Sequence, residues 1–371
     1  MSTPPNPQQL SYVPFSPAIE QPQPNEQQLV DETVAAMKQM AQQQFDHHRH
    51  ASRDAHAKSH AIVKGELHIP ANLPPHLAQG LFALPGTYPV IIRISTASGQ
   101  LLPDKVSGFR GFAVKVLNVP GTKLGPEDTD ALTQDFLLVN HPTIPTGNIQ
   151  QYHAGIMKLA KVAGAPEELR AVASAVGQGV HKALEAVGVE SDLLPLGMDQ
   201  PQRHILGETF HSMGAFRYGD YVAKISAAPL SDNVRALTGQ IQDIDADSKW
   251  RDILGDFFRT QGAEYELRAQ LCTNFDTMPV EDGSVEWPAD QSPFQPIGRI
   301  VIAPQESYSP ARRVFGDDVL SFSPFHCLPA HQPLGSINRV RRLAYPSSSR
   351  FRHEQNVQPR REPQDINELP D

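Results

Sequence analysis

Proline limits what this chain can fold into more than any other residue. It accounts for 34 of the 371 residues, nearly twice the usual share of about 5%. Because proline lacks a backbone N–H and clashes with the preceding helical turn, much of the backbone must lie in turns, extended arms and edge segments. A simple all-helical bundle is therefore not expected. Residues 1–24 hold seven of the prolines among Gln, Asn and Ser, which predicts an extended arm that could lie on a neighbouring subunit.

Charge and cysteine content exclude several classes of protein. With 32 Lys and Arg against 41 Asp and Glu, the formal net charge is -9, so neither a nucleic acid nor an anionic membrane is expected as the main partner. Cys272 and Cys327 lack C-x-x-C spacing, and we interpret them as reduced core thiols. No apolar run reaches the roughly 18 residues of a membrane span, and the N-terminus lacks a secretory signal. These features predict a cytoplasmic protein.

Hydrophobic periodicity divides the rest of the chain into helical and extended segments. Residues 25–45 show helical spacing, and residues 149–187 predict a helical insertion. Short alternating runs between Gly and Pro turns predict strands at residues 61–68, 90–96, 112–119, 136–139, 218–228, 265–272 and 298–302. Turns of this kind favour an antiparallel meander, which closes most naturally into a barrel or a sandwich.

The C-terminal part of the chain is expected to cover this core. Residues 303–335 are rich in Pro, Ser, His and Phe with little periodicity, which predicts a long wrapping connection. A helix is expected over residues 336–353, and the charged residues 354–371 predict a flexible tail. The predicted fold class is therefore α+β, with residues 25–353 forming one large domain or two modest ones around an antiparallel barrel or sandwich at about 60–302.

The last predicted helix carries the most informative pattern. Arg341, Tyr345, Ser349 and Arg352 follow one another at steps of four, four and three, so one helix face presents a phenol between two guanidinium groups. The positive charge favours the phenolate and lowers the pKa of the tyrosine. A phenolate is a hard anionic ligand that suits ferric iron. A core-packed tyrosine with two solvated arginines stays open as the alternative.

A second pattern combines a strand with the segment before the first strand. Arg93 lies in the apolar run V-I-I-R-I-S-T, where its charge must meet a carboxylate of the protein or of a cofactor. Ser95 lies on the same face of that strand, and a histidine such as His56 could act there as a general acid and base. His56 could equally be a surface or turn residue. We interpret D-H-H-R-H at residues 46–50 as a solvated helix end rather than a metal site.

Together these segments resemble the haem catalase family. The resemblance rests on six motifs in the family's order: R-D-A-H-A-K (53–58), R-I-S-T-A-S-G (93–99), F-R-G-F-A-V-K-V (109–116), V-E-W-P…I-G-R-I-V-I (285–302), F-S-P (322–324) and R-R-L-A-Y-P-S-S-S-R-F-R (341–352). They cover most of residues 50–353. The resemblance implies a catalase-type barrel with surrounding helices and a C-terminal haem-ligand helix.

The resemblance also implies a role for each matching residue. Tyr345 would be the proximal ligand of haem b, and Arg341 would keep it ionised. His56 would be the distal histidine that moves a proton between the two peroxide oxygens, and Ser95 would fix its tautomer. Three arginines would pair with the haem propionates: Arg53, Arg93 and Arg352. Gly111 would let the backbone approach the porphyrin.

Several positions depart from the family pattern. If T-Q-D-F-L-L-V-N-H-P (133–142) is aligned on the family's strand, Thr133 takes the place of the distal asparagine that orients peroxide. Leu137 and Leu138 then replace aromatic residues over the haem. Gly335 replaces an aspartate that supports the arginine beside the ligand. The match ends soon after the haem-ligand helix, so only the core of the family is expected here.

Three functions follow as hypotheses. The first is a haem-dependent peroxidase of catalase type that cleaves hydrogen peroxide or an organic peroxide and oxidises a small organic reductant. The second is a fatty-acid hydroperoxide-transforming enzyme similar to allene oxide synthase, which Leu137 and Leu138 would suit although Ala55 replaces the threonine of that branch. The third, haem binding without turnover, is disfavoured by the presence of both His56 and Ser95. A homo-oligomer is left open.

Overall fold

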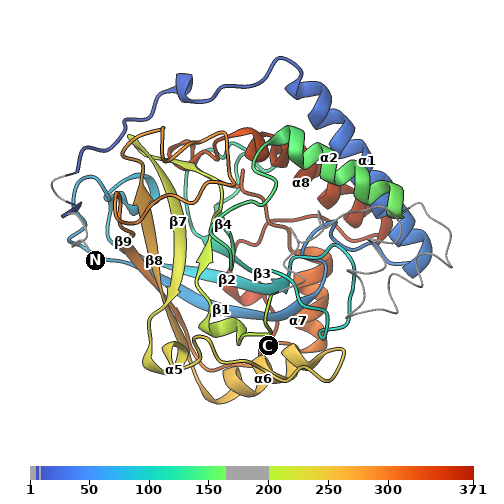
Figure 1. The fold of residues 1–371 in the computed structure, drawn as a ribbon. Helices are drawn as coiled ribbons and strands as arrows, with labels where there is room; N and C mark the ends of the chain where they lie inside the picture. Colours follow the sequence, from blue (N-terminus) through green and yellow to red (C-terminus); the bar gives the residue numbers. More distant parts are fainter. Residues whose placement is uncertain (1–5, 8–9, 164–199) are drawn as a thin grey trace.

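A computed structural model describes residues 6–7, 10–163 and 200–371. Within these residues, eight antiparallel strands form a closed barrel in the order β5-β4-β3-β2-β1-β9-β8-β7, and pairing between β5 and β7 closes it (Figure 1). The short strand β6 extends β7. The strands are β1 (Ser59–Ile69), β2 (Gly86–Thr96), β3 (Arg110–Leu117), β4 (Thr133–Val139), β5 (Phe210–His211), β6 (Phe216–Tyr218), β7 (Tyr221–Pro229), β8 (Ala263–Leu271) and β9 (Gln295–Ile302). The predicted antiparallel barrel and the α+β class are confirmed.

Successive side chains along the strands alternate between the apolar interior of the barrel and its outer face. Residues such as Ile92, Phe112 and Leu138 point inward and belong to one large apolar core. Their neighbours point outward, because successive side chains of a strand lie on opposite faces. Ser95 pairs with Gly111, and Gly111 pairs with Val139, so these three residues form a row on the outer face of the barrel.

The helices lie outside the barrel. They are α1 (Glu26–His48), α2 (Ile149–Ala163), α5 (Asp232–Arg235), α6 (Lys249–Thr260), α7 (Pro310–Val314) and α8 (Ser336–Gln355). Figure 1 shows α1, α2 and α8 gathered on one side of the barrel, where each contacts the other two. Residues 149–163 of the predicted insertion are helical as expected, and residues 164–187 lie outside the described part. None of the helices in the described residues has the length and apolar character needed to cross a membrane.

The described part of the N-terminal arm, which includes a short 3-10 helix at Pro17–Ile19, lies on the chain's own barrel. The backbone N–H of Val13 donates to the carbonyl of Cys272 at 2.8 Å, and that of Phe15 donates to Asp220 at 2.7 Å. The Phe15 ring also lies under the guanidinium of Arg217. The arm therefore finds its partners within one subunit.

The segments after β9 are more ordered than the sequence suggests. The wrapping segment contains α7 and a π-helical turn, η6 (Phe315–Val319). We expected residues 354–371 to form a flexible tail, but they run back over the barrel. Leu369 is fully buried in an apolar cluster with Ile62 and Ile91, and the carboxylate of Glu362 lies 2.6 Å from the Lys115 amine.

Candidate active site

The candidate site lies between the outer face of the barrel and α8. His56 belongs to the connection from α1 to β1, and its Nδ1 lies 3.0 Å from the hydroxyl of Ser95 on β2. Its backbone has a φ of 55°, a left-handed conformation that is strained for a histidine. The N–H groups of His56 and Ala57 hold that conformation by donating to Ala97 and Ser98, both at 3.0 Å. The structure therefore brings the predicted His56 and Ser95 together.

Gly111 makes room for this imidazole. A Cβ atom at position 111 would lie 2.5 Å from Nδ1 of His56 and 2.8 Å from the Ser95 hydroxyl oxygen. Both distances are shorter than van der Waals contact allows, so only glycine fits without displacing the pair. The predicted approach of Gly111 to a porphyrin stays a prediction, and contact with His56 is a separate reason for the glycine.

The environment keeps His56 neutral. Burial, followed by the positive charges of Arg93, Arg341 and Arg53, lowers the pKa of its imidazole from 6.5 to about 3. An imidazole with Nδ1 bonded to Ser95 can accept a proton at its other nitrogen. The site therefore holds a neutral proton acceptor throughout the physiological pH range.

Three predicted arginines converge on the π-helical turn η6. Arg93, which is 2% exposed, donates from Nη2 to the Asp317 carboxylate at 2.9 Å. Arg53 donates to the carbonyls of Gly316 and Leu320, and Arg352 donates to the Asp317 carbonyl at 2.7 Å. The carboxylate expected beside Arg93 is thus supplied by the protein itself.

Within the described residues, Asp317 is the only carboxylate at ion-pair distance from these guanidinium groups, and the charges of Asp318 and Asp54 act on Arg352 from farther away. Burial, followed by repulsion from Arg93, lowers the pKa of Arg352 to about 10, and burial and repulsion from Arg93 and Arg352 place the pKa of Arg53 well below its ordinary value. The buried Nε of Arg352 has no hydrogen-bond partner. At close range the cluster therefore keeps surplus positive charge, three guanidinium groups against one carboxylate in direct contact, and additional carboxylates would pair with it.

Tyr345 is half-buried on α8. Within residues 6–7, 10–163 and 200–371, its hydroxyl makes no hydrogen bond. Burial raises the pKa of the phenol, Arg341 lowers it and Asp54 raises it, with a net increase. The predicted effect of Arg341 has the expected sign, but burial outweighs it. Ionisation would therefore need a further cation at the oxygen, such as a metal ion.

Asp54 and Tyr152 belong to the same site and had no signal in the sequence. The Ser348 hydroxyl on α8 donates to the Asp54 carboxylate at 2.8 Å, which ties the segment that carries His56 to the helix that carries Tyr345. Tyr152 on α2 has a pKa raised to about 12, by burial and then by Asp54. All these side chains are half-buried, yet burial dominates their pKa shifts. Neighbouring parts of the protein therefore surround each of these groups closely enough to disfavour its charged form.

The strand register corrects two of the predicted departures. Thr133 pairs with Leu117, at the end of β4 opposite to Val139, and donates to Glu362 at 3.0 Å. It is therefore far from His56 and does not replace a distal asparagine. Asn140, directly after β4, accepts a hydrogen bond at 2.6 Å from the backbone N–H of Arg110, the residue before Gly111. In the sequence, the N-H-P triplet that follows the strand could have indicated that this asparagine lies near the site.

Leu138 also differs from expectation, and the structure gives a reason for the glycine at position 335. Leu138 is 2% exposed and belongs to the barrel core, so only Leu137 lies on the outer face. Gly335 has a φ of 87° and its added Cβ would collide with the Val280 carbonyl. No aspartate fits there, and Arg341 instead donates to Asn338 at 3.2 Å.

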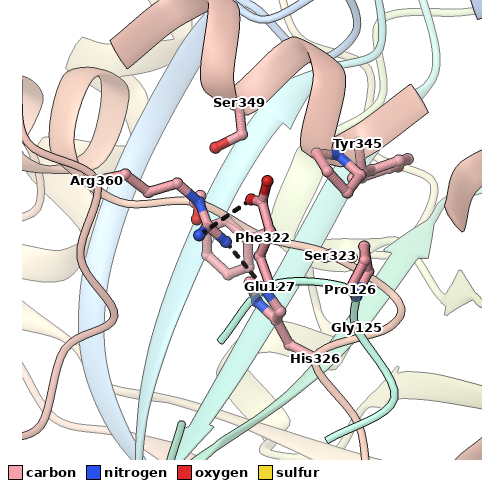
Figure 2. Close-up of a pocket in the computed structure, with 11 residues that line it drawn as sticks. Gly125, Pro126, Glu127, Phe322, Ser323, His326, Tyr345, Ser349 and Arg360 are labelled. Carbon is pink, nitrogen blue, oxygen red and sulfur yellow. Dashed lines mark hydrogen bonds and ion pairs between the residues drawn. The ribbon is translucent and has the colours of Figure 1, made fainter. Parts of the chain in front are cut away.

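A small, partly open pocket adjoins Tyr345. Figure 2 shows its lining, which comes from several parts of the chain: Tyr345 and Ser349 of α8, Phe322 and His326 of the wrapping segment, Glu127 from the connection between β3 and β4, and Arg360 from the segment after α8. Arg360 bonds Glu127 at 3.2 Å. Asp128, His326 and Glu362 also cluster here, but Arg360 and Lys115 already pair with these acids, so we interpret them as an ion-pair network.

The histidines at residues 46–50 end a helix, as predicted. His47 and His48 are the last residues of α1, and both are exposed. His50 instead pairs with Asp318 at 2.8 Å. Neither Cys272 nor Cys327 forms a disulfide, and both are buried, as the interpretation of core thiols requires.

Comparison with solved structures shows that this architecture is the catalase-type fold. A fungal catalase matches with a TM-score of 0.56 and 17% identity over 88% of this chain and 67% of its own. Catalase A from Saccharomyces cerevisiae matches with a TM-score of 0.57 and 16% identity over 88% and 69%. A bacterial catalase matches with a TM-score of 0.51 and 17% identity, and the chain spans 59% of it. No protein-family model and no curated protein matches the sequence.

Proposed function

We propose that this protein is a haem-dependent peroxidase of catalase type. It would cleave hydrogen peroxide or an organic peroxide and oxidise a small organic reductant. The observation that carries the proposal is that one site brings together a neutral His56, hydrogen-bonded to Ser95, and the phenol of Tyr345, which has no hydrogen bond within the described residues. The positive charge of Arg341 lowers the pKa of both groups. The fold likeness to catalases supports the same chemistry.

The residues present fit haem b. The Tyr345 hydroxyl is free to act as an iron ligand, and a ferric ion at that oxygen would offset the burial that raises its pKa. The surplus charge of Arg53, Arg93 and Arg352, with the unpaired Nε of Arg352, suits the two propionates. When bound, haem would supply the ferric iron at which the O–O bond is broken.

The distal residues would handle the proton. The unbonded ring nitrogen of His56 would take a proton from one peroxide oxygen and return it to the other, the leaving oxygen. Ser95 would hold the ring orientation during both transfers, and Gly111 would leave space for it. Burial would exclude bulk water and strengthen each of these interactions.

Two substitutions test the proposal. Tyr345→Phe is expected to abolish the Soret band and high-spin ferric spectrum of protein reconstituted with haem, whereas the control Tyr88→Phe on β2 should keep them. His56→Ala should bind haem and lose peroxide cleavage. An unchanged spectrum in Tyr345→Phe would assign the ligand elsewhere.

Substrate assays separate the enzyme classes. Oxygen evolution from hydrogen peroxide and oxidation of a phenolic dye are expected for a peroxidase of catalase type. If the protein only consumes the conjugated diene of a fatty-acid hydroperoxide, the peroxidase proposal is wrong and the allene oxide synthase-like alternative takes its place. Haem binding without any turnover would favour a non-catalytic role.

A further inference from the structure

A group of basic side chains continues the outer-face row beyond the site. Val139 pairs with His211 on β5, His211 pairs with Ser226 on β7, and Ser226 pairs with Arg268 on β8. Lys224 lies two residues before Ser226, on the same face of β7. We call His211, Lys224 and Arg268 the basic strip.

The cations of the basic strip have no acidic partner in direct contact within the described residues, although the charges of Glu286 and Asp282 act on Lys224, and that of Glu266 on Arg268, from farther away. Within the described residues, neither Lys224 nor Arg268 has a carboxylate at ion-pair distance. The Lys224 amine donates only to the Val285 carbonyl, at 3.2 Å, and Arg268 donates only through Nε, to the Ser226 hydroxyl at 3.1 Å. Both terminal nitrogens of the Arg268 guanidinium are therefore available to a ligand.

Burial makes this arrangement costly. Lys224 is 5% exposed, and burial lowers its pKa to about 8. Burial also lowers the pKa of Arg268, and it lowers that of His211 to about 4. Cations in such an environment are normally paired with an anion. The missing anion points to a ligand that carries one.

Aromatic rings give the strip an apolar cover. The Arg268 guanidinium lies 5.0 Å from the centre of the Phe294 ring, and the His211 ring lies 5.9 Å from it. The Lys224 amine lies 5.1 Å from the Trp287 ring. Cations framed by aromatic rings and apolar residues suit an organic carboxylate better than a small inorganic anion.

The strip lies at a defined separation from His56. Gly111, which contacts the His56 ring, and Arg268 occupy the same row four strand positions apart. At the usual strand spacing this is about 19 Å measured around the barrel. Val139, between them, presents an apolar side chain. A ligand that reaches both ends therefore needs an apolar body and an anionic end.

From this juxtaposition we propose that the basic strip binds the carboxylate of an amphiphilic organic hydroperoxide whose peroxide group reaches His56. Arg268 and Lys224 provide the charge, and Phe294 packs beside the first carbons of the ligand. The inference rests on the proposed function for the identity of the reacting group, whereas carboxylate binding by the strip stands independently of it.

Binding of an unreactive ligand tests the strip without turnover. Calorimetry would compare a long-chain fatty acid with its methyl ester on the full chain. The acid is expected to bind the wild type about 10- to 100-fold more tightly than the ester, the value of one or two charge-assisted hydrogen bonds. Arg268→Gln and Lys224→Met should each remove most of that preference.

Matched variants distinguish a loss of carboxylate binding from a folding defect. Arg299→Gln removes an arginine of the neighbouring strand β9 that pairs with Glu264 at the surface, and it should keep the preference for the acid. Arg268→Lys keeps the charge and should restore most of the binding lost in Arg268→Gln. Equal binding of acid and ester to the wild type, or an unchanged preference in Arg268→Gln, would overturn the inference.

Turnover on the wild type separates the two proposals. With haem bound, kcat/KM for a fatty-acid hydroperoxide should exceed that for its methyl ester, while cumene hydroperoxide should react like the ester. Peroxide cleavage without a preference for the acid would reject the strip and leave the peroxidase proposal standing. Acid-selective binding without any peroxide cleavage would keep the strip and reject the proposed function.

Discussion

At the scale of single residues, the chemistry of the site depends on how one imidazole is held. The Ser95 hydroxyl hydrogen-bonds Nδ1 of His56, and the missing side chain of Gly111 leaves the space that the imidazole occupies. The charges that act on His56 come from Arg93, Arg341 and Arg53, and all are positive. Burial and these charges act in the same direction, so a second proton on the ring is strongly disfavoured.

We predict that peroxide cleavage changes little between about pH 5 and about pH 8, because His56 stays neutral over this range. The rate should fall as the pH approaches 3, the value to which its pKa is lowered. The folded-state pKa lies below the unfolded one, so the contribution of His56 to stability is present above pH 6.5 and is lost as the pH falls through about 3. Stopped-flow rates with hydrogen peroxide would measure this, and a midpoint near 6.5 would contradict it.

At the scale of elements, α8 is fixed at its start by the opposite end of the chain. Arg339 pairs with Glu20 of the arm at 2.7 Å, with Glu281 at 2.8 Å and with Glu26 at the start of α1. The Gly335 N–H also donates to Glu20. The helix that carries Tyr345 is therefore held by segments more than 300 residues away in sequence.

Substituting Arg339→Met should lower the free energy of unfolding by about 1–3 kcal/mol, the range for hydrogen bonds to charged groups. Urea denaturation monitored by circular dichroism would measure the loss. Arg235→Met, which removes an exposed pair with Asp232, should cost less than about 1 kcal/mol. Equal losses in the two variants would show that the Arg339 cluster does not anchor α8.

At the scale of the whole molecule, the C-terminal segment completes the charge balance of the barrel. The Lys115 side chain is fully buried on the outer face, 2.8 Å from Asp135 and 2.6 Å from Glu362. Burial opposes ionisation of Glu362, but Lys115 and then His326 outweigh it and lower its pKa to about 2. Without residues 354–371, Lys115 would keep one carboxylate instead of two.

Glu362→Gln should therefore lower the free energy of unfolding by about 3 kcal/mol, the lower end for a broken buried pair, because Asp135 remains. The pKa of Glu362 is lowered on folding, so its contribution is present above about pH 4.5 and is lost as the pH falls through about 2. Thermal unfolding at pH 7 and pH 3 would measure both effects. The exposed Glu354→Gln serves as the control and should change neither.

The barrel and much of the site could be predicted from sequence because their signals are local. Alternation located the long strands, and one helix carried both Tyr345 and Arg341. Asp317 had no such signal, because its partner Arg93 lies 224 residues away. The position of Thr133 was predicted wrongly because an alignment of sequences does not determine the register of a strand. The pairing of Thr133 with Leu117 determines that register. Helix α6 was missed although its apolar residues Trp250, Leu254 and Phe258 face the core.

The closure of the barrel has a consequence for its motion. Strand β5 contains only Phe210 and His211, and through it alone β4 is joined to β7 in the ladder of the described residues. We call this two-residue junction between β4 and β7 the seam. Opening the seam breaks few backbone hydrogen bonds, so we expect hydrogen exchange of the barrel amides to begin there. The seam borders Val139, whose partner Gly111 lies under His56. Local opening at β5 would thus loosen the barrel wall beside His56 while α8 stays anchored through Arg339.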